Sequence, residues 1–160
     1  MYSISSESAR HPDILKLIAA LDRYQSELYP AESNHLLDLS ELPQETLILM
    51  IIRDPQLTAV GCGAVVLNGD GTGEMKRVYI DPTHRGQHLG EKLLAALEDE
   101  ALSRHCHTLR LETGIKQHAA VRLYERCGYE LRPAFAPYSE DPLSLFMEKA
   151  LVEDVRLAAL

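Results

Sequence analysis

The sequence lacks the long apolar segments that membrane proteins carry. Its longest apolar run, residues 47–52, is far too short to cross a bilayer, which takes about 20 apolar residues in a helix. The N-terminal stretch does not show the succession of basic, apolar and small residues that forms a signal peptide. We therefore expect a protein with neither a membrane span nor a secretion signal.

Cysteines and basic residues are also scarce. The three cysteines, Cys62, Cys106 and Cys127, form no CxxC pair, and a sparse odd count is typical of reduced thiols in the cytoplasm. Lysine and arginine number 16 against 24 aspartates and glutamates, so the net charge is −8. A field of that sign repels phosphate backbones and anionic membranes, which argues against nucleic acid and membrane as partners.

What the sequence does have is the composition of an ordinary globular domain. Hydrophobic residues make up 46% and charged residues 25% of its 160 residues. A chain of this length forms one domain of common size and buries about 70% of the surface of the unfolded chain. No repeat, low-complexity tract or long linker interrupts it, so we expect a single domain over residues 1–160.

Apolar periodicity and turn residues predict a mixed α/β (α+β) domain. The predicted order is an extended piece, a helix, three meandering strands, a helix, a strand, a helix and two closing strands. The predicted strands or extended pieces are residues 2–6, 46–53, 58–67, 73–80, 108–113, 129–134 and 143–151. The predicted helices are residues 12–28, 90–104 and 117–127, with a short additional helix around residues 35–39.

Residues 78–94 carry the most informative pattern, in which a strand ends, a short loop with two glycines follows and a helix begins. Unpaired backbone N–H groups at a helix start donate to anionic oxygens, and the helix dipole adds about 0.3–1 kcal/mol. Gly86 and Gly90 allow the backbone to approach a ligand closely. Nearby cationic or proton-donating side chains are those of His84, Arg85, His88 and Lys92. The pattern suits a pyrophosphate, and it also fits a glycine-containing connection that binds nothing.

The loop Arg85-Gly86-Gln87-His88-Leu89-Gly90 resembles the [RQ]-x-x-G-x-[GA] acyl-CoA loop of the GNAT N-acetyltransferase superfamily. The family usually has glycine where His88 stands. The preceding strand, residues 73–80, is similar to the strand that leads into that loop in the family. Residues 117–129 are similar to its N-x-x-A-x-x-L-Y-x-x-x-G-[FY] helix, with Gln117 where asparagine is usual. Together these matches cover residues 73–130.

This resemblance implies a mostly antiparallel central sheet with helices on both faces and two central strands that splay apart. In the family, the pantetheine arm of CoA enters that gap and pairs with backbone groups like an added strand. The resemblance thus implies acetyl-CoA as co-substrate and no metal. The cofactor contacts that it implies are Val78, Tyr79, Ile80, Arg85, Gly86, Gln87, His88, Leu89, Gly90, Gln117 and Tyr124.

The same resemblance implies two catalytic residues. Tyr124 matches a phenol that protonates the departing thiolate in many family members, and its ordinary pKa near 10 keeps it protonated at neutral pH. Glu74 stands where some members place the base that deprotonates the acceptor amine, directly or through a water. Other interpretations stay open. Tyr124 could be a packing residue, and Glu74 could be a carboxylate that pairs with Lys76, which lies two residues further along on the same face of the strand. Glu112, in the following strand, is a second candidate base.

The acceptor pocket is predicted from two segments. In the family, the region between the first two helices walls this pocket, so the resemblance implies acceptor contacts there, and the loop between the last two strands supplies further candidates. The candidate acceptor contacts are Tyr29, Glu32, Ser33, His35, Glu112, Phe135 and Tyr138. An ordinary capped loop explains the first segment equally well, with Ser33 or Asn34 as helix cap.

The expected function is an acetyl-CoA-dependent N-acetyltransferase that acts on a small amine by direct transfer in a ternary complex. A lysine or N-terminus of a protein remains an alternative acceptor, and a non-catalytic CoA-binding regulatory module is an alternative of another class. Family members are often dimers, which leaves a homodimer open. His105-Cys106-His107 is expected to be a surface turn, because adjacent side chains diverge and no second ligand pair has zinc spacing.

Overall fold

The structure, a computed structural model, describes residues 1–28 and 38–151. In chain order its elements are β1 (Ser3–Ser6), α1 (Pro12–Leu28), the 3₁₀ turns η2 (Leu39–Glu41) and η3 (Gln44–Thr46), β2 (Leu47–Arg53), β3 (Ala59–Leu67), β4 (Thr72–Ile80), the 3₁₀ turn η4 (Pro82–His84), α2 (Leu89–Ser103), β5 (Thr108–Gly114), α3 (His118–Arg126), β6 (Glu130–Arg132) and β7 (Ser144–Ala150).

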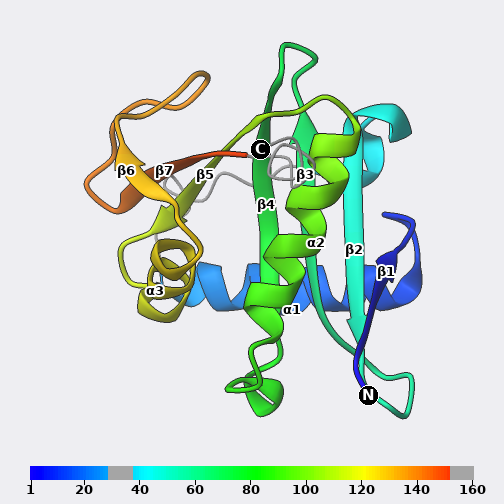
Figure 1. The fold of residues 1–160 in the computed structure, drawn as a ribbon. Helices are drawn as coiled ribbons and strands as arrows, with labels where there is room; N and C mark the ends of the chain where they lie inside the picture. Colours follow the sequence, from blue (N-terminus) through cyan, green and yellow to red (C-terminus); the bar gives the residue numbers. More distant parts are fainter. Residues whose placement is uncertain (29–37, 152–160) are drawn as a thin grey trace, which may run out of the picture.

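The strands form one seven-stranded sheet in the order β1-β2-β3-β4-β5-β7-β6. Every neighbouring pair is antiparallel except β4 and β5, which are parallel and joined by α2. The prediction of a mixed and mostly antiparallel sheet is confirmed. Figure 1 shows α2 on one face of this sheet and α1 behind the opposite face, so helices cover both faces as predicted.

The core is divided by the sheet into two layers. Along β2, Ile48, Met50 and Ile52 pack in the layer under α2, while Leu49 and Ile51 pack in the layer under α1. This alternation is the pleat of a strand that is covered on both faces, and it explains why β2 is apolar at almost every position. The two layers fix the central strands from both sides.

The predicted elements agree with the structure to within one or two residues at most boundaries. The main difference is β6, predicted over residues 129–134, which pairs with β7 only from Glu130 to Arg132. Pro133 follows at once and has no N–H to donate, so it ends the ladder. Of the short helix expected around residues 35–39, residues 35–37 lie outside the described residues, and Leu39 opens the 3₁₀ turn η2.

Within residues 1–28 and 38–151, none of the helices has the length and apolarity that crossing a membrane requires. The sheet and its helices extend from Ser3 to Ala150. The single domain over residues 1–160 stays a prediction.

Candidate active site

β4 and β5 lie side by side over only part of their length. Their parallel pairing runs from Thr72 opposite Thr108 to Met75 opposite Leu111, and β4 then continues to Ile80 without a partner on β5. The two strands therefore part after Met75, in the middle of the sheet. This is the splay of central strands that the family resemblance predicts.

A β-bulge lies in the part of β4 that pairs with β3 but has no partner on β5. Opposite Cys62 and Ala64, two positions apart on β3, stand Tyr79 and Lys76, which are three positions apart on β4. Arg77 sits in this bulge with a φ of 56°. A bulge bends its strand and turns the following residues to new directions. It therefore sets the backbone of residues 78–80, which were predicted to contact the pantetheine arm.

The turn that leads from β4 into α2 presents a row of backbone N–H groups. Lys92 is the first residue at the helix start whose N–H bonds back into the turn, to the carbonyl of His88 at 3.3 Å. Within the described parts of the chain, the N–H groups of residues 86–91 have no acceptor. This row lies at the positive end of the α2 dipole, where anionic oxygens are favoured.

A cavity of about 340 Å³ opens between the end of β4, the start of α2 and α3. Its wall contains all the predicted cofactor residues except Gln87 and Tyr124. The predicted residues in the wall are Val78, Tyr79, Ile80, Arg85, Gly86, His88, Leu89, Gly90 and Gln117. The structure thus gathers a strand, a loop and a helix start around one cavity, as the motifs predicted.

Two residues of the loop take left-handed backbone conformations, Gly86 with a φ of 84° and His88 with a φ of 60°. This conformation costs a residue with a side chain about 1–2 kcal/mol, which explains why glycine suits the position of His88. The His88 side chain is 83% exposed, and its Nδ1 lies 3.0 Å from Oε2 of Glu91. The imidazole therefore stays at the rim of the cavity and leaves the backbone N–H row accessible.

Gly90 has a packing role in addition to the predicted backbone approach. A Cβ atom at Gly90 would lie 2.8 Å from Cδ2 of Leu123 on α3, closer than carbon atoms tolerate. The missing side chain allows the first turn of α2 to pack directly against α3. Both helices then contribute to the wall of the cavity.

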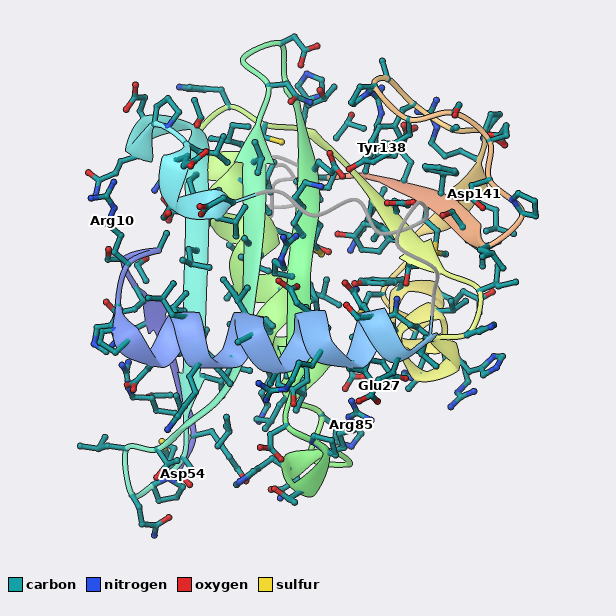
Figure 2. All side chains as sticks on the ribbon, turned by 180° about the vertical axis from the view of Figure 1, so that it is seen from behind. Arg10, Glu27, Asp54, Arg85, Tyr138 and Asp141 are labelled. Carbon is teal, nitrogen blue, oxygen red and sulfur yellow. The ribbon has the colours of Figure 1, made fainter. Side chains whose placement is uncertain are left out.

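Basic side chains gather at the cavity although the chain is acidic. Arg85 precedes the N–H row, and Figure 2 shows it in the turn beyond the end of the sheet. Arg122 and Arg126 of α3 also line the cavity, and Nη2 of Arg126 lies 2.6 Å from Oε1 of Glu91. The Arg126 guanidinium and then His88 hold the pKa of Glu91 below its usual range. The sequence reasoning missed both α3 arginines, although their i, i+4 spacing on one helix face was a usable signal.

Tyr124 is not among the residues that line this cavity. Its side chain is buried, and its ring packs edge-to-face against Tyr129 with the centroids 5.8 Å apart. Burial, with a smaller effect of Cys127, raises the pKa of Tyr124 above its ordinary value. The phenol therefore stays protonated at neutral pH, as a proton donor must. Its role as general acid stays a prediction.

Glu74 lies on the α1 side of the sheet, directly before Met75, which is the last residue of β4 that pairs with β5. Its Oε2 accepts a hydrogen bond from Tyr138 Oη at 2.6 Å and lies 3.0 Å from Lys76 Nζ. Lys76 Nζ also donates to Tyr138 Oη at 2.7 Å. The predicted base and one predicted acceptor contact are thus brought together, and the alternative pairing of Glu74 with Lys76 is present as well.

The other predicted acceptor residues are placed in different ways. Glu112 on β5 accepts a hydrogen bond from Ser144 Oγ at 2.7 Å. Phe135 is buried, with its ring centroid 5.3 Å from that of Tyr138 and 5.6 Å from that of Phe146. The rings of Phe135, Tyr138 and Phe146 form an aromatic wall beside Glu74. The remaining candidates, Tyr29, Glu32, Ser33 and His35, lie outside the described residues.

Cys62 and the His105-Cys106-His107 segment are not among the residues that line the cavity. Cys62 and Cys106 are buried, and burial raises the pKa of Cys62 to about 12, so its thiol is not a ready nucleophile. His105 and His107 flank Cys106 in the turn between α2 and β5. Among residues 1–28 and 38–151, no group of three or more histidine, cysteine, aspartate or glutamate side chains could hold a metal ion.

The sequence matches the family model described as Acetyltransferase (GNAT) family over residues 14–129, which is most of the chain and includes every element around the cavity. The chain belongs to this family. As a GNAT acyltransferase, it has the loop, the splayed strands and the α3 helix that its sequence motifs predicted.

Similar proteins support the assignment. The chain is 45% identical over 150 residues to an IAA acetyltransferase of Azospirillum brasilense, covering 93% of this chain and 97% of the relative. A candidate acyl-CoA N-acyltransferase of Klebsiella pneumoniae has a crystal structure that matches with a TM-score of 0.87 at 60% identity, covering 95% of this chain and 99% of that one.

A second solved structure shares the fold at lower sequence identity. YncA of Salmonella typhimurium, solved with its cofactor acetyl-CoA, matches with a TM-score of 0.64 and 20% identity, covering 95% of each chain. A likeness at this identity shows the fold.

Proposed function

We propose that this GNAT enzyme transfers the acetyl group of acetyl-CoA to a primary amine of a small molecule, by direct transfer in a ternary complex. The observation that carries the proposal is the cavity beside the splayed strands. Its wall combines the unpartnered N–H row of residues 86–91, the three arginines Arg85, Arg122 and Arg126, and the end of β4 that lacks a β5 neighbour. These groups fit a long ligand with a diphosphate at one end and an amide-bearing arm at the other.

The chain's residues would hold the co-substrate by complementary groups. The N–H row would donate to the diphosphate, and the arginines would offset its charge. Residues 78–80, on the edge of β4 that faces the opening, would pair with the amides of the pantetheine arm as a neighbouring strand does. The bound thioester would supply an activated acetyl group. A backbone N–H of residues 78–80 would polarise its carbonyl, and one such donor lowers a barrier by about 3 kcal/mol.

Two side chains would move the protons. Glu74 would take a proton from the acceptor ammonium, directly or through a water, because one of its two oxygens is engaged and the other has no partner among the described residues. Tyr124 would donate a proton toward the departing thiolate, since burial keeps its phenol protonated. Acetyl transfer from thioester to amine then needs no residue of the chain as nucleophile.

The side chains around Glu74 suit a positively charged acceptor. The carboxylate of Glu74 lies beside an aromatic wall of Phe135, Tyr138 and Phe146. Carboxylates and aromatic faces both attract ammonium groups, which supports a primary amine as acceptor. The three cysteines are free thiols, which supports the cytoplasm as the place of the reaction.

The test is acetyl-CoA consumption by the purified chain against a panel of small amines, lysine peptides and peptide N-termini. We expect thiol release that depends on a small amine and formation of its N-acetyl product. Tyr124→Phe, which keeps the ring and removes the hydroxyl, should bind CoA and turn over much more slowly.

Three other results contradict the proposal in distinguishable ways. CoA binding without turnover on any acceptor indicates a regulatory CoA-binding module. Turnover confined to peptides indicates a protein acetyltransferase. Failure to bind CoA at millimolar concentration removes the cavity as a CoA site.

A further inference from the structure

Tyr138 and Lys76 form a compact group with the carboxylate of Glu74. Tyr138 comes from the loop between β6 and β7, 64 positions along the chain from Glu74, and its hydroxyl donates to Glu74 Oε2 at 2.6 Å. Lys76 Nζ lies 3.0 Å from the same oxygen, and it donates to the Tyr138 hydroxyl at 2.7 Å. The side chains of Lys76 and Glu74 are only 10% and 14% exposed. Figure 2 shows Tyr138 at the end of the sheet opposite to Arg85.

Both contacts go to one oxygen of Glu74. Among the residues that the structure describes, Oε1 of Glu74 has no hydrogen-bond partner, and the Glu74 side chain is not fully buried. The Tyr138 ring is held in turn by Phe135 and Phe146, with centroids 5.3 and 5.8 Å away. The carboxylate is therefore fixed through Oε2 while Oε1 remains able to accept a proton.

A second group of one tyrosine, one lysine and one glutamate, formed by Tyr129, Lys149 and Glu98, has a different arrangement. Tyr129 Oη donates to Glu98 Oε2 at 2.9 Å, and Lys149 Nζ lies 2.9 Å from Glu98 Oε1. The Glu98 side chain is 13% exposed, almost the same as that of Glu74. At Glu98 the two partners occupy both oxygens. At Glu74 they share one oxygen.

We propose that Tyr138 and Lys76 are positioning residues of the acetyl transfer, which hold the Glu74 carboxylate oriented so that its Oε1 takes the proton of the acceptor amine. The inference rests on the proposed function, in which Glu74 is the base. Tyr138 and Lys76 act through Glu74 and need not touch the acceptor. The proton passes from the acceptor nitrogen to Oε1, directly or through a water, while the Oε2 contacts stabilise the carboxylate that accepts it.

Other charged groups near Glu74 have their own partners. The charged and titratable neighbours are Lys76 and Arg77 on β4, Arg110 and Glu112 on β5, and Tyr138. β3 places the apolar Val66 opposite Glu74. Arg110 pairs with Glu148 at 2.8 Å, Arg77 with Asp22 of α1 at 3.4 Å, and Glu112 with Ser144. Lys76 and Tyr138 are therefore the two neighbours whose replacement removes a direct contact to the Glu74 carboxylate.

The test is the pH dependence of kcat/KM, measured with the best amine of the panel. Tyr138→Phe keeps the ring and removes the hydrogen bond to Oε2 of Glu74, so we expect the acid limb of the kcat/KM profile to move up by about one pH unit. The kcat/KM of Tyr138→Phe is then about tenfold below that of the unsubstituted enzyme at pH values below the midpoints of both acid limbs, and the two values converge at high pH. Lys76→Met moves the limb in the same direction, and Lys76→Arg, which keeps the charge, restores it close to the original position.

Tyr129→Phe is the matched control, because it removes the same kind of hydrogen bond from Glu98. We expect it to lower the melting temperature about as much as Tyr138→Phe does and to leave the acid limb in place.

An unchanged acid limb in Tyr138→Phe, or an equal shift in Tyr138→Phe and Tyr129→Phe, would overturn the positioning role while the acetyltransferase activity stands. Absence of turnover by the unsubstituted chain at every pH would overturn the proposed function and this role with it.

Discussion

At the scale of single residues, the two proton transfers are assigned to opposite faces of the sheet. Glu74 lies on the α1 side, where Lys76 and Tyr138 hold it. Tyr124 lies on the α2 side, buried against Tyr129. β4 and β5 stop pairing after Met75, and the proposed position of the thioester between them would place the base on one side of it and the acid on the other.

Replacement of Tyr124 by phenylalanine should lower kcat by about 10²–10⁴-fold, the usual contribution of a positioned proton donor. The dissociation constant for CoA should change little, because the ring stays in place. Since burial raises the pKa of Tyr124, the unsubstituted enzyme should show no loss of kcat from this group between pH 7 and its ordinary pKa of about 10. Steady-state kinetics with isothermal titration of CoA tests both points, and a Tyr124→Phe enzyme of unchanged kcat would contradict the assignment.

The left-handed backbone of His88 gives a second prediction at this scale. His88→Gly and His88→Ala both remove the imidazole, but only alanine keeps a Cβ at a φ of 60°. We expect the glycine variant to be more stable than the alanine variant by about 1 kcal/mol, as measured by urea unfolding. Equal stability of the two variants would show that the loop relaxes out of this conformation.

At the scale of elements, the contact between α2 and α3 shapes the cavity. Gly90→Ala places a methyl group against the buried side chain of Leu123, and we expect the start of α2 to move away from α3 and the N–H row with it. We expect CoA affinity to fall about tenfold. Adding Leu123→Ala should restore part of the loss, because the two sites are in direct contact and couple. A double-mutant cycle on the CoA dissociation constant measures this, and strictly additive losses would contradict the packing explanation.

Local sequence signals predicted most of the elements, and most of the predicted cofactor residues line the cavity. Leucines at helical spacing in α2, the apolar run of β2 and the turn Asn68-Gly69-Asp70-Gly71 each express one physical preference within a few residues. Residues of the loop and of the α3 motif line one cavity, and their role in binding CoA stays a prediction. The shortening of β6 depended on Pro133, whose missing N–H limits its pairing with β7.

Local sequence signals did not predict the contacts between segments that are distant in the sequence. The hydrogen bond from Tyr138 to Glu74 joins residues 64 positions apart, and the bulge at Arg77 appears only in the register of β3 against β4. The sequence suggested Glu74 and Tyr138 for separate roles, as base and as acceptor contact. Their direct contact depends on the β6–β7 loop packing over the α1 side of the sheet.

At the scale of the whole molecule, an acidic chain holds a basic cavity. The net charge is −8, yet three arginines and a row of N–H donors meet where a diphosphate would bind. Short-range contacts in a cavity are screened by salt much less than the long-range field of the surface. Binding of an anionic ligand therefore depends on these local groups rather than on the charge of the chain.

Because strand β4, helix α2 and helix α3 all contribute to the cavity, CoA should stabilise the folded chain as a unit. At a free concentration one hundred times the dissociation constant, we expect about 2.7 kcal/mol of stabilisation. For a domain of this size, that corresponds to a rise of about 5–10 °C in the melting temperature. Calorimetry with and without CoA checks this. Inorganic phosphate at the same concentration serves as the control and should give a much smaller rise.

The most direct measurement is a crystal structure of the chain with acetyl-CoA. We expect the diphosphate within hydrogen-bond distance of the N–H groups of residues 86–90, the arm along residues 78–80, and the acetyl group in the opening between β4 and β5, between Glu74 and Tyr124. A cofactor bound elsewhere on the molecule, or an acetyl group that points away from this opening, would contradict the account.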